Sequence, residues 1–212
     1  DNQQNSIYVF DKQTGKNYSS AITNAGSENK YNTLKTEFGD INLESIYQKT
    51  DNLYASILKR LSNAKTLEKF EIEDFYSLAF IVANQLRRVK MERLTIDHMN
   101  KQLYDQLIDL NKNYGKPSYE RLSSEEVKLI SILNSFNLDQ EIESLLNKGI
   151  FLIINKTEYP FITSDNPIIT YNTFPYGGNS IMDKGIEIYF PINKEIMVAF
   201  WCKSIIGKLE LS

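Results

Sequence analysis

The stretch at residues 138–154, LDQEIESLLNKGIFLII, contains the change of pattern that decides the fold. Apolar residues of its first part recur at helical spacing, whereas its last five residues, IFLII, form the continuous apolar run of a buried strand. Gly149 stands between the two parts, and we predict that it closes a short helix over residues 138–148 in the left-handed conformation. Helices are therefore expected before Gly149 and strands after it.

Four segments ahead of Gly149 have apolar residues at the spacing of a helix. We predict helices over residues 42–61, 72–93, 94–110 and 123–137. The second of these is apolar around its whole circumference, so we expect it to be buried on all sides. The last begins at Ser123, because a serine hydroxyl can cap the first turn and the carboxylates that follow suit the helix dipole.

Strand-like runs separated by turn residues follow Gly149. They lie at residues 151–154, 161–163, 168–171, 186–190 and 196–201. One more run, at residues 7–10, precedes a turn at residues 11–16. Helices and strands stand in separate blocks without alternating, which favours the α+β class. We predict an N-terminal strand and turn, a central helical bundle and a C-terminal, mainly antiparallel sheet.

The composition is that of an ordinary globular protein. Of 212 residues, 42% are hydrophobic and 24% are charged, so we predict a single domain over residues 1–212. The net charge of −3 gives no general attraction to nucleic acid or to an anionic membrane, although it allows a local basic patch. The single cysteine, Cys202, and apolar runs far shorter than about 20 residues favour a cytoplasmic protein without a membrane span. Because the chain starts at Asp1 without a leader, we expect a piece truncated at its N-terminus.

The most distinctive polar segment is TSDNP at residues 163–167. In one interpretation it is a local turn, in which Asp165 or Asn166 bonds the backbone and Pro167 holds Asn166 in an extended conformation. In the other, Asp165 is a catalytic base or a metal ligand, while Ser164 and Asn166 position the substrate or the carboxylate. Both interpretations place polar groups directly after an apolar strand.

A second polar segment, NQLRR at residues 84–88, ends the helix that is apolar on all sides. Some of its groups should therefore lie where water is scarce, and a buried guanidinium there needs a partner. Gln85 and Arg88 are three residues apart, so we expect them to face carboxylates or an anionic ligand from one side of the helix. The alternative is that Arg87 and Arg88 lie in solvent at the helix end.

Two carboxylates, Glu44 and Asp51, are seven residues apart, which is two helical turns, so both point the same way from one helix. Such a pair can serve a metal or a proton transfer, and it can equally be surface charge. His98 is the one histidine of the sequence, so neither a zinc site nor a Ser-His-Asp triad is expected. The sequence has no phosphate-loop, dinucleotide-binding, HExxH or CxxC pattern.

Several segments, in their order along the chain, resemble one family. They are IYVFDK at residues 7–12, TGK at 14–16, the pair Glu44 and Asp51, QLRR at 85–88, FITSDNP at 161–167 and FPI at 190–192. Over most of its length the chain is similar to the family named domain of unknown function 4238, which occurs mostly in bacteria. Its members usually have a His-His-Tyr-Val-Pro-like segment, expected upstream of residue 1, and Thr-Pro after the arginine that matches Arg88. This chain has Val89-Lys90 there, so we expect the helix to run on toward Leu110.

Three hypotheses about function remain open. The first is a catalytic site that acts on a phosphate-bearing substrate such as a nucleic acid or nucleotide, in the manner of a nuclease-like hydrolase, with a divalent metal as a candidate cofactor. Its catalytic residues would be Asp165, Glu44 and Arg88, and its supporting residues Asp51, Gln85, Ser164 and Asn166. The second hypothesis is a structural polar network of the same residues. The third is a non-catalytic module that binds an anion or nucleic acid.

Overall fold

The computed structural model describes residues 6–21, 24, 31–37, 39–114 and 120–209. The chain divides into two compact units, unit 1 (Asp1–Glu44) and unit 2 (Ser45–Ser212), and the single domain over residues 1–212 stays a prediction. Within the described ranges, no helix combines the length and the apolar character that crossing a membrane requires.

The first hairpin of unit 1 pairs β1 (Ser6–Asp11) with β2 (Lys16–Ala21) in antiparallel register. In its turn the Asp11 carboxylate accepts two backbone N–H groups, and Gly15 adopts a φ of 69° that favours glycine. The predicted strand and turn are confirmed.

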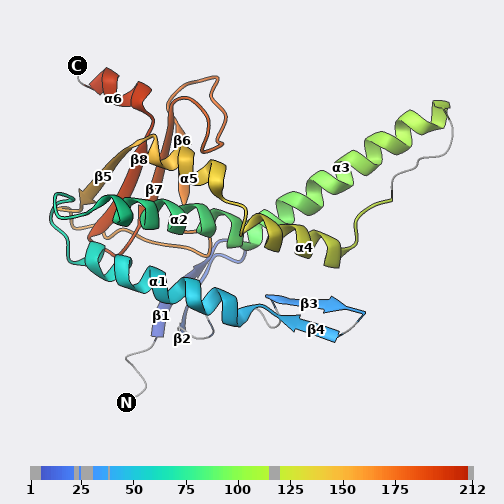
Figure 1. The fold of residues 1–212 in the computed structure, drawn as a ribbon, viewed down its shortest axis with the longest axis horizontal. Helices are drawn as coiled ribbons and strands as arrows, with labels where there is room; N and C mark the ends of the chain where they lie inside the picture. Colours follow the sequence, from blue (N-terminus) through green and yellow to red (C-terminus); the bar gives the residue numbers. More distant parts are fainter. Residues whose placement is uncertain (1–5, 22–23, 25–30, 38, 115–119, 210–212) are drawn as a thin grey trace. The chain divides into compact units, whose positions relative to one another are not determined.

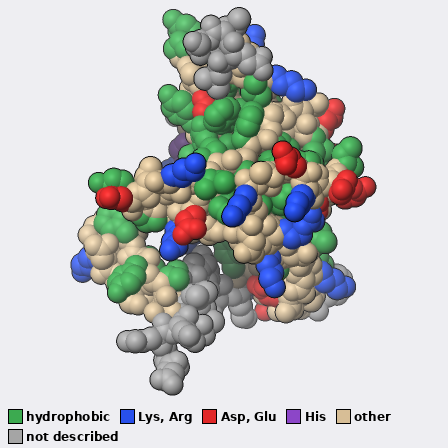
Figure 2. Space-filling model, turned by 90° about the vertical axis from the view of Figure 1, so that its left-hand side faces the viewer, with side chains coloured by type: hydrophobic (Ala, Val, Ile, Leu, Met, Phe, Trp, Pro, Cys, Tyr) green, Lys and Arg blue, Asp and Glu red, His purple; other side chains and the backbone are tan. Residues whose placement is uncertain are grey.

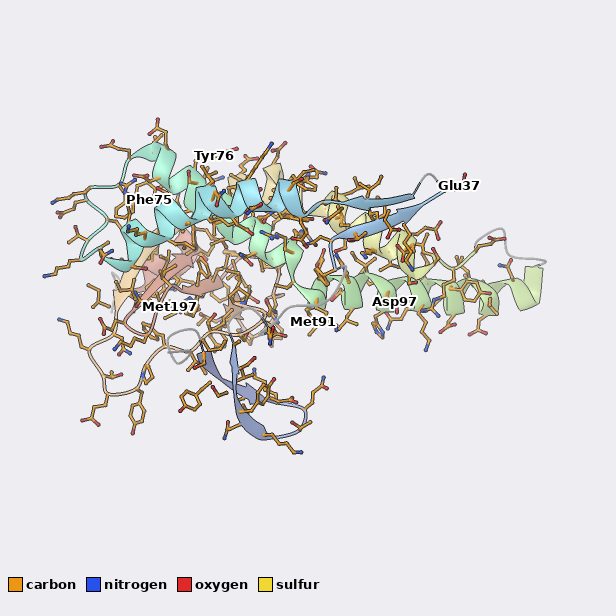
Figure 3. The ribbon with its side chains drawn as sticks, turned by 90° about the horizontal axis from the view of Figure 1, so that it is seen from below. Glu37, Phe75, Tyr76, Met91, Asp97 and Met197 are labelled. Atoms are coloured by element: carbon orange, nitrogen blue, oxygen red, sulfur yellow. The ribbon has the colours of Figure 1, made fainter. Side chains whose placement is uncertain are left out.

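A second hairpin of unit 1 pairs β3 (Thr33–Thr36) with β4 (Gly39–Asn42). Glu37 lies at its tip (Figure 3). This hairpin was not predicted, because its strands have four residues each and show no clear alternation of apolar and polar side chains. The predicted helix start near residue 42 is therefore shifted: the Asn42 side chain instead accepts the backbone N–H of Glu44, where the helix begins.

Unit 2 combines helices with a four-stranded antiparallel sheet (Figure 1). The helices are α1 (Glu44–Ser62), which begins in unit 1, α2 (Ile72–Arg88), α3 (Lys90–Tyr114), α4 (Ser124–Asn134), α5 (Asp139–Leu146) and α6 (Lys203–Leu209). The strands are β5 (Gly149–Ile154), β6 (Ile169–Asn172), β7 (Ile186–Pro191) and β8 (Ile196–Trp201), in the order β5-β8-β7-β6. A block of helices ahead of an antiparallel sheet confirms the α+β prediction.

The core lies between one face of this sheet and the helices α1, α2 and α5. Ile188 and Phe190 of β7 stand opposite Phe200 and Val198 of β8, and all four are buried. Each such side chain stabilises the fold by roughly 1.5–3 kcal/mol through burial. Residues of α2 and of the sheet belong to the same core, so this packing holds in place the helix that carries the polar groups described below.

Burial of α2 on all sides is confirmed for the middle of the helix. Its buried residues are Leu78, Ala79, Ile81, Val82, Ala83 and Asn84. The start of the helix differs: Tyr76 is exposed, and Phe75 is half-buried against the ring of Phe70 (Figure 3). Asn84 is the polar exception in the middle of the helix, so its amide lies where hydrogen bonds have to come from other elements.

The predicted continuation of α2 beyond Arg88 is wrong. Val89 is buried and extended, with φ −73° and ψ 152°, and α3 starts at the next residue. On a continuous helix, residues five apart lie far round the circumference, so Arg87 could not reach Glu92. The break allows their ion pair of 2.8 Å, and it lets α3 project away from the sheet and pack against α4 (Figure 1). Tertiary contacts therefore end this helix without a proline.

Two further local predictions are wrong. Residues 161–163 form no strand: Pro160 lacks the N–H that a ladder would use, and Ile162 is 81% exposed. Gly149 does not close α5 in the left-handed conformation but is the first residue of β5. A Cβ atom at Gly149 would lie 2.3 Å from the Ile206 side chain, so this glycine permits a close approach and not a turn.

Candidate functional site

The candidate site lies in the seam between α1 and α2. The two helices run antiparallel side by side, since Asp51 pairs with Arg88 at one end and Arg60 pairs with Asp74 at the other (Figures 1 and 3). One face of each helix forms the seam. We define the seam as Tyr47, Asp51 and Tyr54 of α1 with Phe80, Asn84 and Arg88 of α2, which recur at intervals of three or four residues.

Arg88 is held by two residues of α1. Its Nη1 donates to Asp51 Oδ1 over 2.6 Å, and its guanidinium carbon lies 4.4 Å from the centre of the Tyr47 ring. The Arg88 side chain is 19% exposed, whereas that of Asp51 is 53% exposed. The predicted partnership of Arg88 with a carboxylate is confirmed, and the partner is the Asp51 that was expected only to support the site. The alternative of an arginine lying free in solvent is wrong.

Two polar atoms of the seam are buried without a hydrogen-bond partner among the described residues. They are the Tyr54 hydroxyl and Asn84 Oδ1, in residues that are 3% and 1% exposed. The Asn84 amide nitrogen donates to the Ser135 carbonyl over 2.8 Å, and the hydroxyl groups of Tyr47 and Ser135 lie 3.0 Å apart. An unpaired buried polar atom costs about 1–3 kcal/mol, so the seam has unused hydrogen-bonding capacity at a place where that capacity is expensive.

The charges of the seam act on Tyr54. Burial raises the pKa of the Tyr54 hydroxyl far above its usual value, while nearby Arg88 lowers this pKa and Asp51 raises it. The hydroxyl is therefore protonated at neutral pH. It can donate one hydrogen bond to an acceptor such as a phosphate oxygen and accept another.

Arg87, the neighbour of Arg88, belongs to a different cluster. Its Nε donates to Glu141 over 3.0 Å, its Nη2 also bonds Glu141, and its Nη1 reaches Glu92 over 2.8 Å. Burial lowers the pKa of Arg87, but the two carboxylates outweigh burial and the pKa is raised overall. These bonds tie α2 to α5 and α3. The expectation that a guanidinium near the end of this helix is paired is thus also met by Arg87, although its side chain is 34% exposed.

The TSDNP segment forms a local turn. The Ser164 hydroxyl donates to the Asn166 carbonyl over 2.7 Å, and the Asn166 backbone N–H donates back to Ser164 Oγ over 3.2 Å. Ser164 closes this turn, where the turn interpretation had expected Asp165 or Asn166. Asp165 is exposed, and Asn166 Oδ1 is buried with no hydrogen-bond partner in the described part of the chain. Their catalytic and supporting roles stay predictions.

The remaining predicted residues differ in what surrounds them. Glu44 is the exposed first residue of α1 and accepts a hydrogen bond of 3.0 Å from Asn32 within unit 1. Gln85 is half-buried on α2. Convergence of Glu44 or Asp165 with Arg88 stays a prediction. Where the structure describes the chain, no three His, Cys, Asp or Glu side chains are grouped as metal ligands.

Comparison with protein families places the chain. A family model described as "Protein of unknown function (DUF4238)" matches residues 1–208. The chain belongs to the DUF4238 family. This confirms the resemblance drawn from the motifs, and the family's description names no activity. Searches of curated proteins and of solved structures give no match.

Sequence reasoning missed Tyr54 and Ser135 as residues of or next to the seam, and it gave Asn84 no role of its own within the polar segment at residues 84–88. A signal was present for Asn84, because an amide inside a helix that is apolar all round has to bond outside its own helix. Tyr54 follows Tyr47 by seven residues, the same two-turn spacing that drew attention to Glu44 and Asp51. For Ser135 the sequence carries no such signal, since its partners lie 51 and 88 residues away.

Proposed function

We propose that the seam binds a phosphate-bearing ligand and hydrolyses it, with Arg88 as the anion-binding group and Asp51 as the acid–base group. The observation that carries the proposal is a pair of buried polar atoms, Tyr54 Oη and Asn84 Oδ1, that have no hydrogen-bond partner in the described part of the chain and lie beside an arginine whose carboxylate partner is open to water. Without a ligand or a water to bond these two atoms, the folded state is destabilised by the cost of leaving each of them unpaired.

Asp51 can exchange its partner at small cost. An ion pair with an exposed carboxylate contributes only about 0–1 kcal/mol, so a phosphate that carries more charge can take the place of Asp51 on Arg88. The Tyr54 hydroxyl then donates to a phosphate oxygen, and Asn84 Oδ1 accepts from a hydroxyl of the ligand or from a water. The ligand would satisfy both orphaned atoms.

The released Asp51 is the base of the proposed reaction. A water oxygen forms a bond to phosphorus, its proton passes to Asp51, and the bond to the leaving oxygen breaks, with that oxygen taking a proton from solvent. Arg88 stabilises the charge that develops on the phosphoryl oxygens. Glu44 and Asp165 remain proposed as further carboxylates of this site, and Gln85, Ser164 and Asn166 as its supporting residues.

The test is hydrolysis of bis(p-nitrophenyl) phosphate and of a single-stranded oligonucleotide by the full chain, with and without Mg²⁺ or Mn²⁺. We expect turnover that falls about 100-fold or more in Asp51→Asn and in Arg88→Gln, with melting temperatures close to that of the parent. Lys156→Gln, which removes an exposed charge outside the seam, is the control and should retain full activity.

Other outcomes separate the rival hypotheses. If phosphate compounds bind but are not turned over, the hydrolase is refuted in favour of the binding module. If nothing binds and Arg88→Gln melts many degrees lower, the seam is a structural network and the proposal fails. The ties of Arg87 to Glu141 and Glu92 favour such a structural role for that neighbouring cluster.

A further inference from the structure

A pocket of about 810 Å³ lies at the other end of the α1–α2 pair, where α1 ends and residues 63–70 lead into α2. It is lined by Ser56, Lys59, Arg60, Asn63, Ala64, Lys65, Thr66, Lys69 and Phe70. Its volume is within the range of about 300–1,000 Å³ that is common for small-molecule sites. None of the seam residues lines it.

The lining of this pocket carries charge of one sign. Lys59, Arg60, Lys65 and Lys69 are cationic, and no aspartate or glutamate is among the described residues that line it. Figure 2 looks onto the side where Figure 1 has the α1–α2 connection, and Lys and Arg side chains on this face lie among Asp and Glu side chains, so the excess of positive charge belongs to the pocket lining and not to the whole face. The chain as a whole has a net charge of −3, so this concentration of positive charge is local.

The Arg60 side chain, which lines the pocket, is held in place by two neighbouring residues. It forms a two-pronged ion pair with Asp74, its Nη2 lies 2.8 Å from Asp74 Oδ2, and its guanidinium carbon lies 4.9 Å from the centre of the Phe70 ring. Asp74 therefore neutralises Arg60 from outside the pocket lining. The three lysines remain as the net positive charge that a ligand would meet.

The helix dipole accounts for only part of this charge. Cations in the last turn of a helix stabilise its carbonyl end, which explains Lys59 and Arg60 at the end of α1. Lys65 and Lys69 lie on the connection beyond that turn, where the dipole gives no reason for them. Like charges brought to one concave surface repel each other, and a bound anion would relieve this repulsion.

We infer that this pocket binds a small anion that carries two or more phosphate groups. Three lysines match the charge of such an anion better than that of a single phosphate, and Ser56 and Thr66 add hydroxyl donors to the lining. The inference is independent of the proposed hydrolysis, because it uses none of the seam residues.

The experiment is calorimetric titration of the full chain with inorganic pyrophosphate and, separately, with inorganic phosphate, at low and high salt. We expect pyrophosphate to bind at least tenfold more tightly than phosphate, with an affinity that falls as salt rises. The double substitution Lys65→Gln with Lys69→Gln should weaken pyrophosphate binding at least tenfold. Both lysines are exposed, so the melting temperature should hold.

The matched control is Lys12→Gln with Lys16→Gln, which removes the same charge from exposed positions of the first hairpin and should leave binding unchanged. Equal losses in both double variants would mean non-specific attraction and would overturn the site. So would the absence of pyrophosphate binding, or binding that Arg88→Gln abolishes. If a 20-nucleotide single strand binds more tightly than pyrophosphate, the inference that the ligand is a small molecule is wrong.

Discussion

Arg87 and Arg88 are neighbours at the end of α2, yet they belong to different regions of unit 2. Arg87 binds Glu141 of α5 and Glu92 of α3, whose side chains are only 8% and 16% exposed. Arg88 binds Asp51 of α1, whose side chain is open to water. The two arginines therefore differ mainly in the burial of their carboxylate partners. The buried carboxylates of Arg87 indicate a structural role, whereas the exposed carboxylate of Arg88 is compatible with a binding site.

The energetic difference follows from solvent. A buried carboxylate that loses its cation stays charged where water cannot reach it, and breaking such a pair costs about 3–5 kcal/mol. An exposed carboxylate is re-hydrated at once, so the same loss costs about 0–1 kcal/mol. Arg88 is therefore the arginine that can change partner without unfolding the protein.

The largest effect should come from Arg87→Met. We expect the free energy of unfolding to fall by about 3 kcal/mol, because Glu141 loses its cation in a buried position. Urea denaturation of the parent and variant measures this. The double variant with Glu141→Leu should recover part of the loss, since both charges are then replaced by apolar groups. If Arg87→Met lowers the free energy of unfolding less than Arg88→Met does, the assignment of Arg87 to the structural cluster and of Arg88 to the candidate site is wrong.

Tyr54→Phe tests the orphaned hydroxyl of the seam. We expect the free energy of unfolding to rise by about 1 kcal/mol without ligand, because the substitution removes a buried polar atom that has no hydrogen-bond partner among the residues the structure describes. Tyr47→Phe is the control: its hydroxyl lies 3.0 Å from Ser135 Oγ, so its removal should lower stability by about 1 kcal/mol. Thermal melts of the parent and of both variants would measure these two changes in stability. Equal destabilisation would mean that the Tyr54 hydroxyl already has a permanent partner.

Arg88→Met should have a smaller effect on stability than Arg87→Met. We expect a loss of about 1 kcal/mol or less, drawn from the exposed pair with Asp51 and the contact with the Tyr47 ring. Repeating the denaturation at high salt should shrink this loss, because exposed pairs are screened. If the free energy of unfolding instead falls by about 3 kcal/mol at every salt concentration, Arg88 has a structural role like that of Arg87.

The smallest effect concerns the ion pair at the other end of the two helices. The hydrogen bond from Arg60 lowers the pKa of Asp74 below its ordinary value of 3.8. A lowered folded-state pKa stabilises the protein above the unfolded pKa, and this stabilisation is lost as pH falls through the folded value. The stability gap between the parent and Asp74→Asn should therefore close at acid pH, as melts across a pH series would measure. A gap that stays constant down to pH 2 would contradict this.

Local chemistry was enough to predict several elements. Ser123 caps α4 as expected: its hydroxyl accepts the Glu126 backbone N–H, and the Glu126 carboxylate accepts from Ser123 in return. The Asp11 turn likewise depends on residues within four positions of each other. At Val89, Gly149 and residues 161–163, where predictions were wrong, the deciding contact or missing partner lies outside the segment; the start of α1, predicted at residue 42, was shifted by a local hydrogen bond between Asn42 and Glu44.

The sequence by itself determined the α+β class, the family, and the expectation that an arginine at the end of α2 is paired, because periodicity, motifs and the cost of a buried charge are properties of short segments. Only the tertiary structure decided that Arg87 is held by Glu141 and that Arg88 faces Asp51. These partners lie 54 and 37 residues away. Which carboxylate is buried depends on how α1, α3 and α5 pack around α2, and no local pattern encodes that packing.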